Sequence, residues 1–207
     1  ADVMVWCDDA YFGLDYEDNI EPESLFSKLA ACHEKILAVK IDGPTKEDYV
    51  WGLRTGFITF GSKGMTDAQY DALIKKLMGV IRSSVSCAAA PSQSLMLKMM
   101  ADPRTEGEKL AFRAMLEERY RIVRKFIDAH QGHRVLKALP FNSGYFMSMK
   151  CVGVGAEELR VKLLHEYGIG TISIDPSHLR VAFSSVDAEK LESLYETIFK
   201  VAEEMVK

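Results

Sequence analysis

Three short, nearly continuous apolar runs constrain the fold of this chain more than any other feature. They are VMVWC (3–7), ILAVK (36–40) and TGFITFG (55–61). Short apolar runs without polar alternation are typical of strands that are covered on both faces of a parallel or mixed sheet. Between the first two runs, PESLFSKLAACHEK (22–35) spaces its apolar residues helically, which predicts a crossover helix. The first part of the chain is therefore predicted to be α/β.

The rest of the chain shows a different pattern. A helix capped by Thr66 is predicted over residues 67–85, and residues 86–93 are predicted to form a link. Apolar residues at helical spacing predict a long helix over 103–130. Short strands then alternate with helices, the layout of a compact α+β module: strands at 143–150, 171–174 and 178–185, and helices at 155–167 and 186–207.

Composition bounds the function. Of the 207 residues, 48% are hydrophobic and 27% are charged, which suits a protein with a sizeable core. The net charge of -4 gives no support to nucleic-acid binding or to a polybasic membrane patch, and no apolar run is long enough to suggest a membrane span. Four widely spaced cysteines without a signal peptide predict a reducing cytoplasm. The chain lacks an initiator methionine and enters a strand at once, so we expect a fragment.

Polar and aromatic residues gather where the first two strands end. Asp8 and Tyr11 follow the first strand, Lys46 follows the second, and Arg54 opens the third. Taken singly, each has an ordinary structural explanation: a turn-starting carboxylate, a packed ring, a solvated lysine and a capping arginine. Because open α/β sheets bind ligands at the carboxyl ends of their strands, the combination predicts a binding site.

This ordered combination resembles the pyridoxal-phosphate enzymes of the aspartate aminotransferase superfamily, the class I and II aminotransferases of fold type I. In that family one strand ends in D-x-x-Y, matched by residues 8–11, and a later S-x-S-K-x₇-R-x-G segment supplies the cofactor lysine, matched by residues 43–56. An arginine in an L-R-V/I-x-F-S context is matched by Arg180 in HLRVAFS. One departure is Gly43, which stands where the family usually has a serine.

The resemblance implies a role for each residue. Lys46 would bond covalently to pyridoxal 5'-phosphate and move the Cα proton of the substrate. Asp8 would pair with the pyridine nitrogen of the cofactor, and Tyr11 would hydrogen-bond its phenolic oxygen. Arg54 would grip the cofactor phosphate with its planar fork, assisted by the hydroxyl of Thr45. Lys46, Asp8 and Tyr11 are thus the predicted catalytic residues, and all five are predicted to bind the cofactor.

The resemblance also implies the domain organisation. Residues 1–101 would be the carboxyl-terminal part of a large cofactor-binding domain with a mixed sheet. Residues 102–207 would be a small α+β domain that includes the long helix and carries Arg180, the predicted ligand of the substrate α-carboxylate. The family's glycine-rich phosphate loop and ring-stacking aromatic lie upstream of the D-x-x-Y strand. The chain is therefore interpreted as the carboxyl-terminal half of such an enzyme.

The expected function is the transfer of an amino group between an amino acid and a 2-oxo acid. We expect a homodimer in the full-length protein, no nucleic-acid or membrane partner, no metal, and no activity from the fragment alone. His130 and His133 are interpreted as helix-end residues. Two alternatives stay open: a pyridoxal-phosphate lyase on the same scaffold, and the non-catalytic effector domain of an aminotransferase-like transcriptional regulator. A regulator would carry a basic helix-turn-helix domain upstream.

Overall fold

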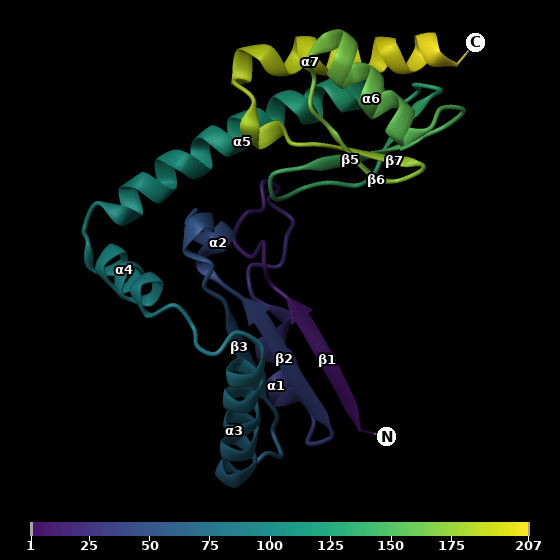
Figure 1. The fold of residues 1–207 in the computed structure, drawn as a ribbon. Coiled ribbons are helices and arrows are strands. Elements are labelled where there is room, and N and C mark those ends of the chain that lie inside the picture. The colour runs from purple at the N-terminus through teal and green to yellow at the C-terminus, as the bar shows by residue number, and fades with distance from the viewer. Residues whose placement is uncertain (1, 207) are drawn as a thin grey trace. The chain divides into compact units, whose positions relative to one another are not determined.

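The computed structural model describes residues 2–206. The chain divides into two compact units, Ala1–Lys109 and Leu110–Lys207 (Figure 1). The boundary between the units falls inside the long helix, whereas the sequence-based boundary between residues 101 and 102 kept that helix whole. The division into a cofactor-binding and a small domain stays a prediction.

A mixed sheet forms the centre of the first unit. The strands are β1 (Val3–Asp8), β2 (Ile36–Asp42) and β3 (Phe57–Gly61), in the order β1-β2-β3. β1 pairs with β2 in parallel and β3 pairs with β2 in antiparallel. The crossover between the parallel strands runs through α1 (Leu25–Cys32), which contacts β2 and β3. This arrangement confirms the α/β, mixed-sheet prediction. The prediction that the strands are covered on both faces is wrong for β1 and β3, where Val3, Trp6 and Phe57 are exposed.

Local capping decides where the helices of this unit begin. α1 begins later than the predicted Pro22, because the Ser24 side chain caps it by accepting a hydrogen bond from the Phe26 backbone N–H at 3.1 Å. α3 (Asp67–Ser84) begins where Thr66 predicts. There the Gln69 Oε1 accepts a hydrogen bond from the Thr66 backbone N–H at 2.8 Å.

Three short or unexpected elements correct the sequence interpretation. The predicted loop around Lys46 contains a one-turn helix, α2 (Pro44–Glu47), and the 3₁₀ helix η1 (Trp51–Leu53). The predicted link at 86–93 covers the start of α4 (Ala90–Ala101). Proline is favourable in a first helical turn because it needs no N–H donor there, so Pro44 and Pro91 start helices rather than break them.

The second unit packs helices on one face of an antiparallel sheet. The long helix α5 (Thr105–Ala129) leads into it, and the strand order is β4-β5-β7-β6. Figure 1 shows α5, α6 and α7 on one side of the strands. The other elements are β4 (Leu136–Ala138), β5 (Met147–Cys151), α6 (Ala156–Tyr167), β6 (Ile172–Asp175), β7 (His178–Val181), the 3₁₀ helix η2 (Phe183–Ser185) and α7 (Ala188–Met205).

Alternation along the strands builds the core of this unit. In β5, Met147, Met149 and Cys151 are buried, while Ser148 and Lys150 between them are more exposed. Alternating burial of this kind is the period-2 pattern of a sheet that is covered on one face. β4 was not predicted, since its three residues are too few to show that period.

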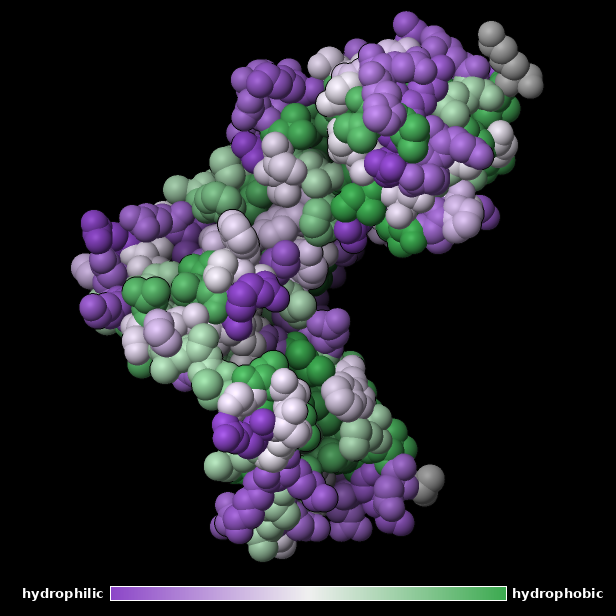
Figure 2. Space-filling view, viewed as in Figure 1, coloured by the Kyte–Doolittle hydropathy of each residue, from purple (hydrophilic) through white to green (hydrophobic). Residues whose placement is uncertain are grey.

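Apolar side chains also reach the surface. Figure 2 shows hydrophobic residues at the surface of the molecule. The exposed apolar residues of the first unit include Ile74, Met78 and Ile81 of α3. Within residues 2–206, no helix combines the length and the apolar character that crossing a bilayer requires. The same part of the chain contains no group of three or more histidine, cysteine or acidic residues placed to hold a metal ion.

The buried phenol of Tyr195 provides a stability test. Its side chain is fully buried in α7, and within the described chain its Oη has no hydrogen-bond partner. Burial raises the pKa of this phenol. An unpaired buried hydroxyl carries its full desolvation cost, so Tyr195→Phe should raise the free energy of unfolding by about 1 kcal/mol in urea titrations.

Tyr120→Phe is the matched control. Tyr120 is equally buried, but its Oη donates a hydrogen bond to the Phe141 carbonyl at 3.4 Å. Removing this hydroxyl should therefore lower the free energy of unfolding by about 1 kcal/mol. Destabilisation by both substitutions would show that the Tyr195 hydroxyl has a partner.

Candidate active site

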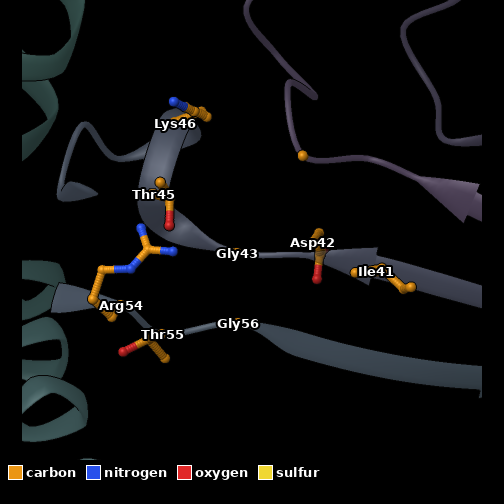
Figure 3. Close-up of a pocket in the computed structure, with 9 residues that line it drawn as sticks. Ile41, Asp42, Gly43, Thr45, Lys46, Arg54, Thr55 and Gly56 are labelled. Carbon is orange, nitrogen blue, oxygen red and sulfur yellow. The ribbon is translucent and has the colours of Figure 1, made fainter. Parts of the chain in front are cut away.

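A pocket of about 320 Å³ lies where β2 ends and β3 begins (Figure 3). The two strands run side by side there, with Asp42 opposite Phe57 in the antiparallel register. The pairing brings together segments that lie on either side of α2 and η1 in the sequence. The lining residues are Ala10, Ile41, Asp42, Gly43, Thr45, Lys46, Arg54, Thr55 and Gly56.

Gly43 permits the close approach of the two segments. A Cβ atom at this position would lie 2.7 Å from the Thr55 carbonyl oxygen and 3.1 Å from the Gly56 Cα, and backbone atoms cannot move aside as a flexible side chain can. The departure from the family's usual serine therefore has a physical reason. A side chain at position 43 would force apart the segments that carry Lys46 and Arg54.

Lys46 presents an amine with altered acidity to this pocket. Burial lowers the pKa of its ammonium group, and the neighbouring Arg54 guanidinium lowers it further by charge repulsion. The Lys46 Nζ also lies 5.3 Å from the centroid of the Tyr11 ring. A lysine with a lowered pKa is more often unprotonated near neutral pH, which is the state needed for nucleophilic attack.

Arg54 occupies a strained backbone position. It caps η1 in the left-handed conformation, with φ at 52°, which costs a non-glycine residue about 1 kcal/mol or more. Its Nη1 donates to the Trp51 carbonyl at 3.2 Å. Figure 3 shows the guanidinium pointing toward Thr45. The conformation thus places a cation and a hydroxyl on the same side of the pocket.

Asp8 and the residues after it form a tight turn at the end of β1. Asp8 is level with Ile41 in the parallel register, and its Oδ1 accepts a hydrogen bond from the Ala10 N–H at 3.2 Å. The turn continues as the Leu14 N–H donates to the Tyr11 carbonyl at 3.1 Å. Ala10 lines the pocket directly, whereas Asp8 stands at the exposed strand end beside it.

A charged network that the sequence interpretation missed anchors this turn. The Ser24 Oγ donates to the Asp9 Oδ2 at 2.5 Å. The Lys40 Nζ lies 2.6 Å from the Asp42 Oδ2 and 3.8 Å from the Asp9 Oδ2, and all three charged side chains are mostly buried. Lys40 and Asp42 break an otherwise apolar strand with opposite charges two residues apart, and that pattern was the available signal.

Arg180 belongs to the second unit, on β7. Its guanidinium carbon lies 4.7 Å from the centroid of the Phe146 ring, a cation–π contact. Its Nε is buried and has no hydrogen-bond partner within residues 2–206. An arginine held on an aromatic face with a spare donor is suited to a bidentate anion.

The side chains of the first unit fit pyridoxal phosphate. Lys46 is the amine, with its pKa lowered as the covalent link requires. Arg54 and Thr45 line the same pocket and provide a cation and a hydroxyl for a phosphate group. The glycine at position 43 lets the segments that carry Lys46 and Arg54 approach closely, since a Cβ atom there would collide with the Thr55 carbonyl. Asp8 offers a carboxylate at the adjacent strand end.

Comparison with solved structures shows the same fold in aminotransferases. An aromatic aminotransferase from Pyrococcus horikoshii is 18% identical, with a TM-score of 0.75 over 98% of this chain and 52% of its own. An aminotransferase from Anaerococcus prevotii is 20% identical, with a TM-score of 0.78 over 99% of this chain and 47% of its own.

A third similar structure contains a cofactor adduct. LysN, an alpha-aminoadipate aminotransferase from Thermus thermophilus complexed with N-(5'-phosphopyridoxyl)-L-leucine, is 17% identical, with a TM-score of 0.76 over 98% of this chain and 51% of its own. The chain spans about half the length of these structures. A comparison with curated proteins found no match.

The family itself follows from a comparison with protein families. The family described as aminotransferase class I and II matches residues 1–198, nearly the whole chain. Its cofactor is pyridoxal phosphate, which confirms the cofactor prediction. The D-x-x-Y turn, the lysine segment and the late-strand arginine all fall within the matched range. The chain therefore belongs to the class I and II aminotransferase family.

Proposed function

We propose that the protein expressed from its complete open reading frame transfers an amino group between an amino acid and a 2-oxo acid by means of pyridoxal phosphate. The observation that carries the proposal is the pairing of Lys46, whose pKa is lowered, with Arg54 in one pocket at the strand ends. A lysine that only faced solvent would have neither the burial nor the neighbouring cation.

Lys46 would do two things in succession. As an unprotonated amine it would hold the cofactor covalently, and its nitrogen would also be the base that takes up and returns the proton at the substrate Cα. Bound pyridoxal phosphate supplies the ring that accepts the electron pair left at Cα. Both tasks need an amine that is unprotonated near neutral pH, and burial together with Arg54 supports that state.

The neighbouring side chains would bind and orient the cofactor. Arg54 would hold the phosphate through two parallel hydrogen bonds, with the Thr45 hydroxyl as a further donor. Asp8 would keep the pyridine nitrogen protonated, and Tyr11 would donate a hydrogen bond to the phenolic oxygen. Arg180 would bind the α-carboxylate of the substrate, which fixes the Cα–H bond for proton transfer.

A homodimer is part of the same proposal. The exposed apolar residues of α3, among them Ile74, Met78 and Ile81, support an association surface in the first unit.

The two alternative functions, a pyridoxal-phosphate lyase and a non-catalytic effector domain, would each give a different result in an activity assay. A lyase would release ammonia from its substrate, and an effector domain would bind a ligand without turning it over.

The effect of Arg54 on Lys46 can be measured without the cofactor. Arg54→Met removes the nearby positive charge, so the pKa of Lys46 should rise toward the ordinary lysine value while burial still holds it below. The measurement is an NMR pH titration of ¹³C-methylated lysines. Arg82→Met, on α3 of the same unit, is the control and should leave Lys46 unchanged. An unchanged Lys46 pKa in Arg54→Met would mean that burial alone lowers it.

Lys46→Ala should abolish both covalent cofactor attachment and transamination in the full-length protein. The reason is that no other amine lines the pocket within residues 2–206. Borohydride reduction followed by peptide mapping would locate the attachment site. Lys63→Ala, at an exposed position after β3, should retain the adduct and the activity. A reducible adduct on another lysine in Lys46→Ala would reject this assignment.

Asp8→Asn should retain cofactor binding but lower turnover by orders of magnitude, since a neutral amide does not keep the pyridine nitrogen protonated. Cofactor affinity by absorbance titration and kcat by coupled assay separate the two effects. Asp71→Asn, an exposed acidic residue on α3, serves as the control. Near-normal kcat in Asp8→Asn would remove Asp8 from this role.

A further inference from the structure

Asp42 places a carboxylate in the lining of the pocket between the end of β2 and the start of β3. Within residues 2–206 it is the one acidic residue that lines this pocket, which also contains Lys46 and Arg54. Figure 3 shows it at the end of β2, next to Gly43. Its side chain is only 18% exposed, and charges repel more strongly where less water screens them. An ionised Asp42 would therefore oppose the binding of a phosphate group at Arg54.

Lys40 forms a mostly buried ion pair with Asp42. The two residues lie two positions apart on β2 and so share one face of the strand. The Lys40 Nζ is 2.6 Å from the Asp42 Oδ2, and the lysine side chain is 21% exposed. A hydrogen bond to Asp42 raises the pKa of Lys40, which keeps the ammonium charged near neutral pH. The pocket lining includes Asp42 but not Lys40, so the lysine acts on a bound anion through this carboxylate.

Contacts with the turn after β1 hold the Lys40 ammonium in place. Its Nζ is 3.8 Å from the Asp9 Oδ2 and 5.2 Å from the centroid of the Phe12 ring. The Ser24 Oγ donates a hydrogen bond to the same Asp9 oxygen, and Ser24 also caps α1. An ammonium that is already fixed beside Asp42 offsets its charge without the entropy cost of ordering a long side chain when an anion binds.

A buried ion pair can also serve only the stability of the fold, and the two roles predict opposite effects when the Asp42 charge is removed. If the pair serves stability alone, removing either partner leaves a buried charge unpaired and should weaken ligand binding through the fold. If Lys40 neutralises Asp42, removing the carboxylate leaves a positive charge beside the pocket, which should strengthen the binding of an anion.

We propose that Lys40 neutralises Asp42 and thereby permits the pocket to bind the cofactor phosphate at Arg54. This inference rests on the proposed function, in which Arg54 holds that phosphate. The observations that carry it are the 2.6 Å approach of Lys40 to Asp42 and the place of Asp42 in the pocket lining. Lys40 is neither a ligand of the cofactor nor a catalytic residue. It sets the charge of the pocket, so that the Arg54 guanidinium attracts the anion without opposition from Asp42.

Calorimetric titration of the cofactor-free, full-length protein with inorganic phosphate tests the proposal. Lys40→Met should lower the phosphate affinity about tenfold at neutral pH, because the Asp42 carboxylate is then unopposed. Asp42→Asn should raise the affinity above that of the wild type, and the double variant should return close to the wild-type value. Lys40→Arg keeps the positive charge and should keep the affinity.

Two further variants assign the bound phosphate to a place in the protein. Arg54→Met should abolish binding, which assigns the anion to this pocket. Lys35→Met, at an exposed position before β2, changes the net charge equally and should leave the affinity unchanged. An unchanged phosphate affinity in Lys40→Met, a lowered affinity in Asp42→Asn, or binding that Arg54→Met does not affect would each overturn the proposal. Absence of phosphate binding by the wild type would overturn it as well.

A cofactor analogue separates the effect of charge from structural damage. Pyridoxal lacks the phosphate, so Lys40→Met should leave its binding unchanged in absorbance titrations while weakening the binding of pyridoxal phosphate. Equal weakening of both would show that the ion pair has a structural role and would overturn the proposal. Charge-dependent phosphate binding without transamination of any amino acid would support the proposal and reject the proposed function. Transamination by the wild type, with equal phosphate affinity in the wild type and in Lys40→Met, would support that function and overturn the proposal.

Discussion

The close approach of residues 42–43 to residues 55–57 is the constraint on which the candidate site depends. β2 and β3 are antiparallel, so the end of β2 lies beside the start of β3. The segment that connects the two strands must therefore leave the sheet and return to it at neighbouring positions. Gly43 allows the contact because a Cβ atom there would collide with the Thr55 carbonyl. The intervening segment folds into α2 and η1, which places Lys46 and Arg54 at the same pocket. The strand pairing therefore brings Lys46 and Arg54 to one pocket.

The sequence predicted the elements whose signal is a long run or a strong periodicity. The strands of the first unit, the capped start of α3 and the helices α5, α6 and α7 all correspond to such patterns. The errors fall where the signal is local. α2 has four residues and β4 has three, too few to show a helical or strand period. α1 begins at Leu25 because the Ser24 hydroxyl competes successfully with Pro22 as a start signal.

For the site, the sequence predicted residue types but not their electrostatic setting. The residues GPTKED do not show that burial would lower the pKa of Lys46 more than the charge of Arg54 does. The link from Ser24 through Asp9 to Lys40 joins residues from α1, the D-x-x-Y turn and β2, and only the register of the parallel pair places them together. Arg180 was predicted from its sequence context, and that role stays a prediction, whereas its place opposite Ser148 depends on which residues are paired in the small sheet. Strand pairing joins residues that are far apart in the sequence, so no single position in the sequence indicates it.

Arg54 would couple the acidity of Lys46 to anion binding. The guanidinium lowers the pKa of Lys46 because its positive charge disfavours a second cation nearby. A phosphate group bound to Arg54 would offset that charge and bring two negative charges toward the amine, so the pKa of Lys46 would rise while burial continued to lower it. The free pocket would then hold the more reactive amine, ready for the carbonyl of an incoming cofactor. With a phosphate bound to Arg54, the Lys46 amine would take up a proton more readily. Arg54 would thus favour an unprotonated Lys46 before a phosphate binds, whereas a bound phosphate would make the same amine a stronger base while burial still favoured its unprotonated form.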